Sequence, residues 1–512
     1  MTFRVWTFVF STLLLVTGCS KSEVVTSYEQ VSAGNEYTKQ QPTQQEVNNN
    51  PVPIMFDASI GEQATTRAEG AATALPSQGF GVFAYLTKKG TYTNGLDGVT
   101  NDGMYHSSGD VTIPNFMYNQ RIYSTDLGAN WLYSPTKYWP NDFNDDGGYV
   151  DNQGATGTAL QRLSFFAYGP YVKFSNTEYV ADVDGDGNTE TVFKAVEDDG
   201  VTPKSEGIMY FTTNAATGDP MLYYQIGNAG AEDLVWGTAA TDASYTDVIG
   251  NSKSYTAGLP ITNATKMKVA GSLNFQFQHV LTAFTVNVGA YFDEGTAADQ
   301  GNNNWEPQNA IADNNYITLE SVTISAAGLP QKGWLNLNNT TANTPKLQKT
   351  LTDASSALST ATHTFTISGD AIDSHVRNLN SETNAQVKER IVNSESETHI
   401  TGVGRRAADG VGVAGLTYPL LGEGKYVMAL PKTGNTTFTI TTKYNVWTLD
   451  PRAVDGITKV ENTITNTVTI GMAGGSNYAI NLWLGMRQVK LTIETYNEYG
   501  GWDNRPENNS NY

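Results

Sequence analysis

The chain has 512 residues and a formal net charge of −20 at pH 7, although only 16% of its residues are charged. This length exceeds what one hydrophobic core organises, so we expect about two to four domains. The acidic surface repels nucleic acid and anionic lipid headgroups, so neither is an attractive partner. Short runs rich in Thr, Val and Tyr, separated by Gly, Asn and Asp, are typical of an all-β protein.

The single cysteine, Cys19, ends an N-terminal apolar segment. Arg4 precedes an apolar run over residues 5–16, which is too short to span a bilayer and has the length of a secretory h-region. The small residues before Cys19 resemble the lipobox of bacterial lipoproteins. This resemblance implies removal of residues 1–18 as a signal peptide and attachment of lipid, such as palmitate, to Cys19. An ordinary signal peptide followed by a chance cysteine is the alternative.

A polar segment and an alternating segment follow. Residues 19–50 have no apolar periodicity and are predicted to be a flexible linker. Residues 51–60 alternate strictly, which predicts a strand with one buried face. Residues 61–70 are small and polar, and they form a predicted accessible loop that contains Arg67 and Ala68. The inward residues of the predicted first strand are Val52, Ile54, Phe56, Ala58 and Ile60.

Strand patterns recur through the rest of the chain. Residues 80–86 are apolar on both parities, which predicts a strand covered on both faces. Residues 273–279 and 281–288 both alternate, and we predict that they form a strand pair. A polar stretch near residue 265 is the predicted boundary between two β-sandwiches, 51–265 and 266–512. Further predicted strands cover 221–226, 317–324, 362–367, 426–430, 436–444, 463–470, 478–484 and 488–494, and a short helix is predicted at 384–392.

The order of the motifs resembles the fimbrillins of Bacteroidales type V pili, especially their Mfa1-like branch. The motifs that carry the resemblance are Cys19, the strand at 51–60, Thr-Thr-Arg-Ala at 65–68, Phe-Gly-Val-Phe-Ala-Tyr at 80–85, Tyr-Trp-Pro at 138–140, Phe-Phe-Ala-Tyr at 165–168, Asp-Leu-Val at 233–235, Leu-x-Phe-x-Phe-x-His-x-Leu at 273–281, Asn-Tyr-Ala-Ile-Asn-Leu at 477–482 and Trp502.

This resemblance implies two tandem transthyretin-like β-sandwich domains with long loops, and a structural pilus subunit that contributes to adhesion. It implies export as an outer membrane lipoprotein precursor, anchored through lipid on Cys19 before processing, with the mature form on the cell surface or in the fimbrium. It also implies proteolysis between Arg67 and Ala68, which removes the first strand. A strand from another pilus subunit would then fill the groove that remains.

A donor strand must present the same period-two apolar series as the strand it replaces. Val489, Leu491 and Ile493 present such a series, and the candidate donor region spans 478–495. The alternative is that these are resident strands of a monomeric surface lipoprotein. Such a protein would bind a host or bacterial glycan or protein through its loops.

An acidic stretch offers a candidate metal site. Asp182, Asp184 and Asp186 match the first half of a calcium loop, D-x-D-x-D-G, in which hard carboxylate oxygens alternate before a sharp turn. Phe193 occupies the position of the usual bidentate Glu, so a solvated acidic turn is the alternative reading. Residues 142–147 form a looser second case. No other cofactor is expected.

No motif predicts an enzyme. The Gly-rich sequence at 410–415 has neither the strand before it nor the helix after it that a dinucleotide site requires. The five His residues have no metal-ligand spacing, and His279, within an alternating strand, is predicted to be structural. The aromatic residues of 131–139 are predicted to pack in the core or loops, with a sugar-stacking platform as the alternative.

Overall fold

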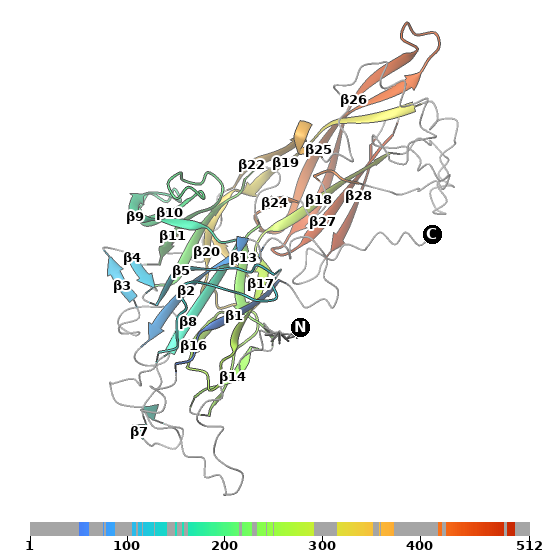
Figure 1. Ribbon diagram of the computed structural model, residues 1–512. Helices are drawn as coiled ribbons and strands as arrows, with labels where there is room; N and C mark the ends of the chain where they lie inside the picture. The colour runs from blue at the N-terminus through green and yellow to red at the C-terminus, as the bar shows by residue number, and fades with distance from the viewer. Residues whose placement is uncertain are drawn as a thin grey trace, which may run out of the picture.

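Nearly every regular element of the described chain is a β-strand. In this computed structural model the described residues are 51–60, 75, 78–87, 105–108, 111–114, 116–126, 128–140, 149–150, 156–157, 162–214, 218–227, 233–241, 243–248, 250–290, 315–351, 358, 360–372, 418–421, 426–485 and 489–496. Four sheets of these residues form two sandwiches arranged end to end (Figure 1). The prediction of an all-β sandwich fold is confirmed. Among the described residues, no helix is long and apolar enough to cross a membrane.

The first sandwich consists of sheets I and II. Sheet I has the order β1 (Met55–Ile60), β17 (Ser272–His279), β13 (Val235–Ala239), β8 (Arg162–Gly169), β2 (Phe80–Thr87) and β5 (Met117–Ile122), with β16 (Ile261–Ala264) paired to β8. Sheet II has the order β21 (Leu347–Gln348), β20 (Lys332–Asn336), β12 (Pro220–Gln225), β11 (Gly207–Thr213), β10 (Glu190–Val196) and β9 (Lys173–Ala181).

Both faces of sheet I are buried. Phe83 and Tyr85 of β2 pack toward sheet II, where Phe83 stacks on Phe211 with ring centroids 4.3 Å apart. Phe80 and Val82 of the same strand belong to a second cluster on the opposite face. β2 is apolar throughout because its alternate side chains pack into two different cores, one on each face of sheet I. This agrees with the prediction of a strand covered on both faces.

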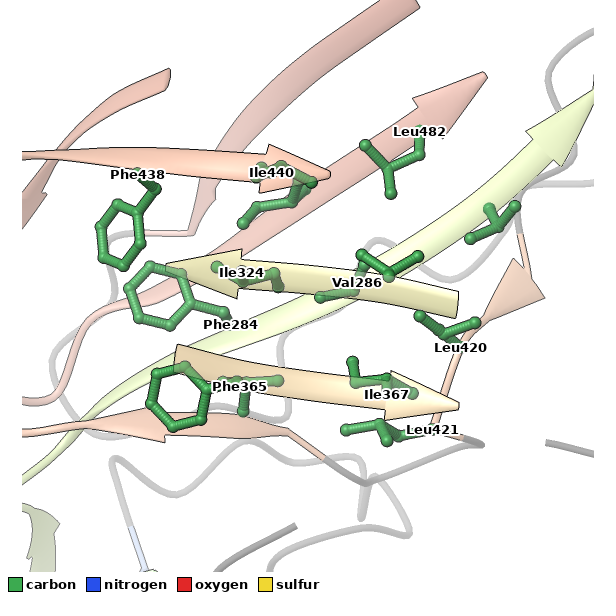
Figure 2. Packing of buried hydrophobic residues seen from close by; sticks show 14 of the residues in the cluster. Phe284, Val286, Ile324, Phe365, Ile367, Leu420, Leu421, Phe438, Ile440 and Leu482 are labelled. Carbon is green, nitrogen blue, oxygen red and sulfur yellow. The ribbon is translucent and has the colours of Figure 1, made fainter. Parts of the chain in front are cut away.

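The second sandwich consists of sheets III and IV. Sheet III has the order β23 (Tyr418–Pro419), β18 (Thr282–Ala290), β27 (Asn477–Leu484) and β28 (Val489–Tyr496), with β24 (Val427–Ala429) paired to β18. Sheet IV has the order β22 (Thr360–Ser368), β19 (Asn315–Pro330), β25 (Lys432–Leu449) and β26 (Ile457–Met472). Figure 2 shows their shared core, in which Phe284, Phe365 and Phe438 come from three strands.

The outward face of β25 and β26 is polar because threonines alternate with core residues. The Oγ1 atoms of Thr437 and Thr469 are 2.9 Å apart, and those of Thr441 and Thr465 are 3.1 Å apart. Branched threonine side chains suit a pleated surface, and their hydroxyls pair across the strands. This alternation gives these long strands, of 18 and 16 residues, one face that packs in the core and one face that is exposed to solvent.

The sheets separate later in the chain than residue 265. β17 pairs with β1 and β13 in sheet I, whereas β18 pairs with β23, β24 and β27 in sheet III. The two alternating segments predicted to form a strand pair therefore belong to different sandwiches, and that prediction is wrong. Alternation reveals that a strand has one buried face but does not identify the sheet that it joins.

The chain also returns to the first sandwich after leaving it. β20 follows β19 of sheet IV directly, yet it pairs with β12 in sheet II, where Leu222 lies opposite Leu335. The helix predicted at 384–392 lies outside the described residues. The remaining elements are the strand pairs β3 (Tyr105–Ser108) with β4 (Val111–Pro114), β6 (Tyr149–Val150) with β7 (Thr156–Gly157) and β14 (Ser244–Thr246) with β15 (Ser252–Ser254), and a 3-10 turn, η2 (Gly369–Ala371).

Candidate functional site: the first strand and its groove

The first strand lies at one end of the strand order of sheet I. β1 runs parallel to β17, with Phe56 beside Leu273 and Ile60 beside Phe277. The predicted inward series is observed: Val52, Ile54 and Phe56 are buried, and Ala58 and Ile60 are half-buried against the same cluster. The regular strand begins at Met55, and residues 52–54 approach it as an irregular extension.

Phe56 is the anchor of this strand. Its side chain is 3% exposed, and its ring centroid lies 5.5 Å from that of Tyr133 and 5.9 Å from that of Phe165. Phe275 of the neighbouring β17 stacks on it at 6.1 Å. The groove beneath β1 is therefore aromatic on three sides, and such contacts add to the free energy gained from burial alone.

A loop holds the residues before β1. The Ile54 backbone N donates to the Lys137 carbonyl at 2.9 Å, and the Trp139 backbone N donates to the Val52 carbonyl at 2.9 Å. The Tyr133 hydroxyl donates to the Ile54 carbonyl at 2.7 Å. The start of the chain's first strand is thus fixed by backbone and side-chain bonds to residues 133–139.

This loop contains the aromatic cluster found in the sequence. Trp139 is 1% exposed and packs against Phe165, and Trp131 packs against Phe80 with ring centroids 5.1 Å apart. These indoles face the core beneath the first strand, whereas Tyr138 is 51% exposed. Trp139 is buried in the core and has no free face for a sugar, whereas Trp131 is half-buried against the same cluster.

The predicted donor series lies at an edge of sheet III. In β28, Val489 pairs with Leu484 and Leu491 with Leu482, antiparallel to β27. Val489 is buried, and Leu491 and Ile493 are half-buried against the core of the second sandwich. Within this chain β28 is a resident strand, and β27 is an interior strand between β18 and β28.

Other predicted site residues lie outside the described part of the chain. They are the lipidation residue Cys19, the processing residues Arg67 and Ala68, and the second acidic stretch at 142–147. The cleavage site falls between β1, which ends at Ile60, and β2, which begins at Phe80.

The three predicted metal-binding aspartates come together with a fourth carboxylate. Oxygen atoms of Asp182, Asp184, Asp186 and Glu190 all lie within 4.8 Å of one another. The loop at 182–189 joins β9 to β10, and the pairing of Ala181 with Glu190 closes it. Glu190 is not among the ligands predicted from the sequence, because the D-x-D-x-D-G pattern places its bidentate Glu at the twelfth position, which is Phe193 here. Glu190 could have been found as the acidic residue that begins β10, the strand that follows the loop.

Burial and mutual repulsion disfavour the charged form of two of these carboxylates. Asp184 is 3% exposed and Glu190 is 7% exposed. Burial raises the pKa of Asp184, and the charge of Asp186 raises it further. Burial, together with the charges of Asp184, Asp186 and Asp182, raises the pKa of Glu190 to about 7. Hard oxygen ligands in this arrangement are suited to a divalent cation.

His279 has a structural environment. It is 3% exposed in β17, and its Nδ1 lies 2.5 Å from Oδ2 of Asp233, just before β13. The pair connects two neighbouring strands of sheet I at their ends.

Comparisons with known proteins give matches to solved structures. Neither protein-family models nor curated proteins match the sequence. The structural neighbours of the chain are Bacteroidales fimbrial and candidate cell adhesion proteins.

A fimbrial protein from Bacteroides vulgatus is 18% identical, with a TM-score of 0.45, over 88% of this chain and 99% of that chain. A candidate cell adhesion protein from Bacteroides uniformis is 12% identical, with a TM-score of 0.33, over 89% and 99%. The fimbrial anchor protein Mfa2 from Porphyromonas gingivalis is 7% identical, with a TM-score of 0.26, over 88% and 100%.

Proposed function

We propose that this protein is a structural subunit of a cell-surface pilus, or fimbria, which assembles by strand exchange and contributes to adhesion. The observation that carries the proposal is the position of β1. It lies at the edge of sheet I, while Val52, Ile54 and Phe56 fill the core beneath it. An edge strand can be removed without separating the other strands of its sheet, and the edge that remains is a template for another strand.

The proposed maturation begins with export. The signal peptide, residues 1–18, is removed, and lipid on Cys19 anchors the precursor to the outer membrane through the linker 19–50. Cleavage between Arg67 and Ala68 then cuts the only covalent connection between β1 and β2, because the chain passes from one to the other through this loop. The mature form is located on the cell surface or in the fimbrium.

Release of β1 would leave a groove that favours a replacement strand. It would uncover the edge of β17 and the rings of Phe165 and Phe275, which Phe56 now covers. Burial of each large apolar side chain of a new strand contributes roughly 1.5–3 kcal/mol. Together with a row of ladder hydrogen bonds, this would hold neighbouring subunits without a covalent link.

The proposed donor is β28 of another subunit. Val489, Leu491 and Ile493 match the inward series of β1. Among the described strands, β28 has a neighbour on one side only, because it ends the strand order of sheet III. β27, with Ile480 and Leu482 fully buried, is less suited because its departure would divide the sheet. The partners are accordingly other pilus subunits of the same or a related type, and the role is structural rather than enzymatic.

A monomeric surface lipoprotein is the second candidate function. It would bind a glycan or a protein through its loops. The residence of β28 in sheet III favours it, because a single chain with both edge strands in place needs no neighbour.

The two functions differ after substitution of Arg67. We expect Arg67→Ala to give exported protein that does not polymerise, because β1 stays attached and keeps its groove filled. Surface extracts on gels, with and without boiling, should show a ladder for the unaltered chain and a single band for the variant. N-terminal sequencing of the surface form should begin at Ala68.

Arg405→Ala is the matched control, because it removes an arginine from another polar stretch and should leave the ladder intact. Normal fibres from Arg67→Ala would contradict the proposed processing. A single band from the unaltered chain would favour the monomeric function.

A further inference from the structure

We propose that the loop between β9 and β10 binds one Ca²⁺ ion through the carboxylates of Asp182, Asp184, Asp186 and Glu190. Their oxygen atoms lie within 4.8 Å of one another, as the ligands of a single ion do. In the described part of the chain none of the four forms an ion pair with Lys, Arg or His. Four acidic groups in this space, two of them buried, lack a compensating charge that a divalent cation would supply.

A buried hydroxyl provides an independent indication of a ligand. Tyr223 of β12 is 2% exposed, and its hydroxyl has no hydrogen-bond partner among the described residues. Tyr223 packs against Trp334 with ring centroids 4.7 Å apart, and Trp334 Nε1 donates to Asp184 Oδ2, so Tyr223 lies beside the acidic loop. Burial and the charge of Asp184 raise the pKa of Tyr223. A buried hydroxyl normally finds a partner. An ion, or a water molecule bound to it, would provide that partner.

The backbone prepares the loop for a cation. The Gly185 N donates to Asp182 Oδ1 at 2.7 Å, and the Gly187 N donates to Asp182 Oδ2 at 3.1 Å. Gly185 and Gly187 have φ of +78° and +94°, which side chains rarely adopt, so the sharp turn requires glycine. Asp182 Oδ2 and Asp184 Oδ1 each accept one backbone hydrogen bond, so each keeps a second lone pair for a metal.

Asp184 connects the loop to the far side of sheet II. Its Oδ2 accepts from Trp334 Nε1 at 2.9 Å and from the Leu351 backbone N at 3.2 Å. The loop therefore folds back over the outer face of the sheet, where Val192, Tyr223 and Trp334 form a buried cluster. Because Trp334 belongs to β20, the ion would strengthen the attachment of the segment that arrives from the second sandwich.

The donor set selects among cations. Only oxygen ligands are present, which disfavours Zn²⁺, whose structural sites use sulfur and nitrogen. Several carboxylates on a loop suit Ca²⁺, which accepts irregular coordination, better than Mg²⁺, which requires a near-octahedral shell. Glu190, at the ninth position from Asp182, supplies the acidic ligand that Phe193 at the twelfth position cannot.

The test is a calcium titration of the thermal unfolding midpoint, with the full folded chain first stripped by EDTA. We expect the midpoint to rise by a few degrees and to saturate below about 10 mM Ca²⁺, since extracellular modules bind with dissociation constants of about 0.1–1 mM. Mg²⁺ should give a smaller rise. The absence of any rise with Ca²⁺, or an equal rise with Mg²⁺, would overturn the proposal.

Three variants locate the site. Asp186→Asn removes one ligand from an accessible position and should raise the half-saturating Ca²⁺ concentration at least about tenfold. Asp199→Asn is the control, because Asp199 accepts bonds from the Val201 and Thr202 backbone in a similar exposed turn but lies outside the cluster. A folded Asp186→Asn variant that responds to Ca²⁺ as the unaltered chain does would refute the assignment.

Tyr223→Phe separates a structural hydroxyl from one that faces an ion. In EDTA we expect this variant to be at least as stable as the unaltered chain, because the hydroxyl that is lost had no partner. Its response to Ca²⁺ should be several-fold weaker. An unchanged calcium response would remove Tyr223 from the site and with it the independent support for an ion.

Discussion

Phe56 contributes more to the attachment of β1 than any position on the strand's other face can. The residue lies among Tyr133, Phe165 and Phe275, while its neighbour Met55 is 37% exposed. Alternation places these two adjacent residues in opposite environments. Phe56 is therefore the main residue that fills the groove proposed for strand exchange.

Phe56→Ala should destabilise the uncleaved protein by about 3 kcal/mol, because it removes buried surface and leaves a cavity. The midpoint of urea unfolding, followed by a probe of the first sandwich, measures this effect. Met55→Ala on the exposed face should shift the midpoint by less than about 0.5 kcal/mol. Equal effects of the two substitutions would show that the observed burial does not describe the strand in solution.

Lys266 predicts a pH dependence of stability. It is 1% exposed, and burial lowers its pKa from 10.5 to about 8. Below pH 8 the residue is protonated in both states, and the folded state carries the cost of a buried charge. Between pH 8 and 10.5 the unfolded state binds more protons, so this residue should make the free energy of unfolding rise with pH.

Lys266→Met should remove this rise and increase stability at pH 7 by about 1–2 kcal/mol, because the folded state no longer holds a buried charge. Urea midpoints of the variant and the unaltered chain, compared at pH 7, 8, 9 and 10, isolate its contribution from other groups. The exposed Lys268, changed to Met, serves as the control. A constant difference between Lys266→Met and the unaltered chain at every pH would contradict the predicted titration.

At the scale of elements, position within the sheet distinguishes strands with similar sequences. β27 and β28 both carry inward-facing leucines, but β27 has neighbours on both sides and β28 lies at an edge. Interior strands lose two hydrogen-bonded ladders when displaced, whereas an edge strand loses one. This difference makes β28 the better candidate for donation.

Leu491→Asp, at a half-buried position of an edge strand, should therefore cost less stability than a charge in the interior and leave exported protein. It should still abolish the ladder on unboiled gels, because a charge cannot enter an apolar groove. Leu482→Asp, in the fully buried interior of β27, should instead prevent accumulation of folded protein, with a cost above about 4 kcal/mol. Export measured by immunoblot and assembly measured on gels separate these outcomes. A persistent ladder in Leu491→Asp would exclude β28 as the donor.

At the scale of the whole molecule, the two sandwiches are interleaved along the chain. Sheet I needs β17 between β1 and β13, and sheet II needs β20 and β21, all of which follow residue 265. Leu281 and Ala283 of the second half also lie in the core between sheets I and II, together with Met428. The first sandwich is thus completed only after much of the second half has been synthesised.

A fragment of residues 51–265 should accordingly fail to fold cooperatively. Without β17, the strand β1 has no partner in sheet I and β13 loses Phe275 and Phe277 beside it. Near-ultraviolet circular dichroism during a urea titration would show a gradual change for the fragment and a cooperative transition for the full chain. A cooperative transition in the fragment would show that β17 is dispensable.

Much of the fold could be predicted from local pattern. Alternation identified the strands at 52–60, 273–279 and 478–494, and the unbroken apolar run of 80–86 identified a strand with two buried faces. These features depend on the period of the side chains and on their contact with water, and both can be read from the pattern of consecutive residues. The three aspartates of the acidic loop were found for the same reason.

The partners of those strands could not be predicted. The sequence by itself determined an all-β chain, its first alternating strand and a cluster of aspartates, because local geometry and burial follow from neighbouring residues. Only the tertiary structure decided that β1 lies beside β17, that β28 is at the end of its strand order, and that Glu190 lies with the three aspartates. Strand pairing joins residues that are distant in the chain, and many registers satisfy the same alternation, so packing of the whole core selects one.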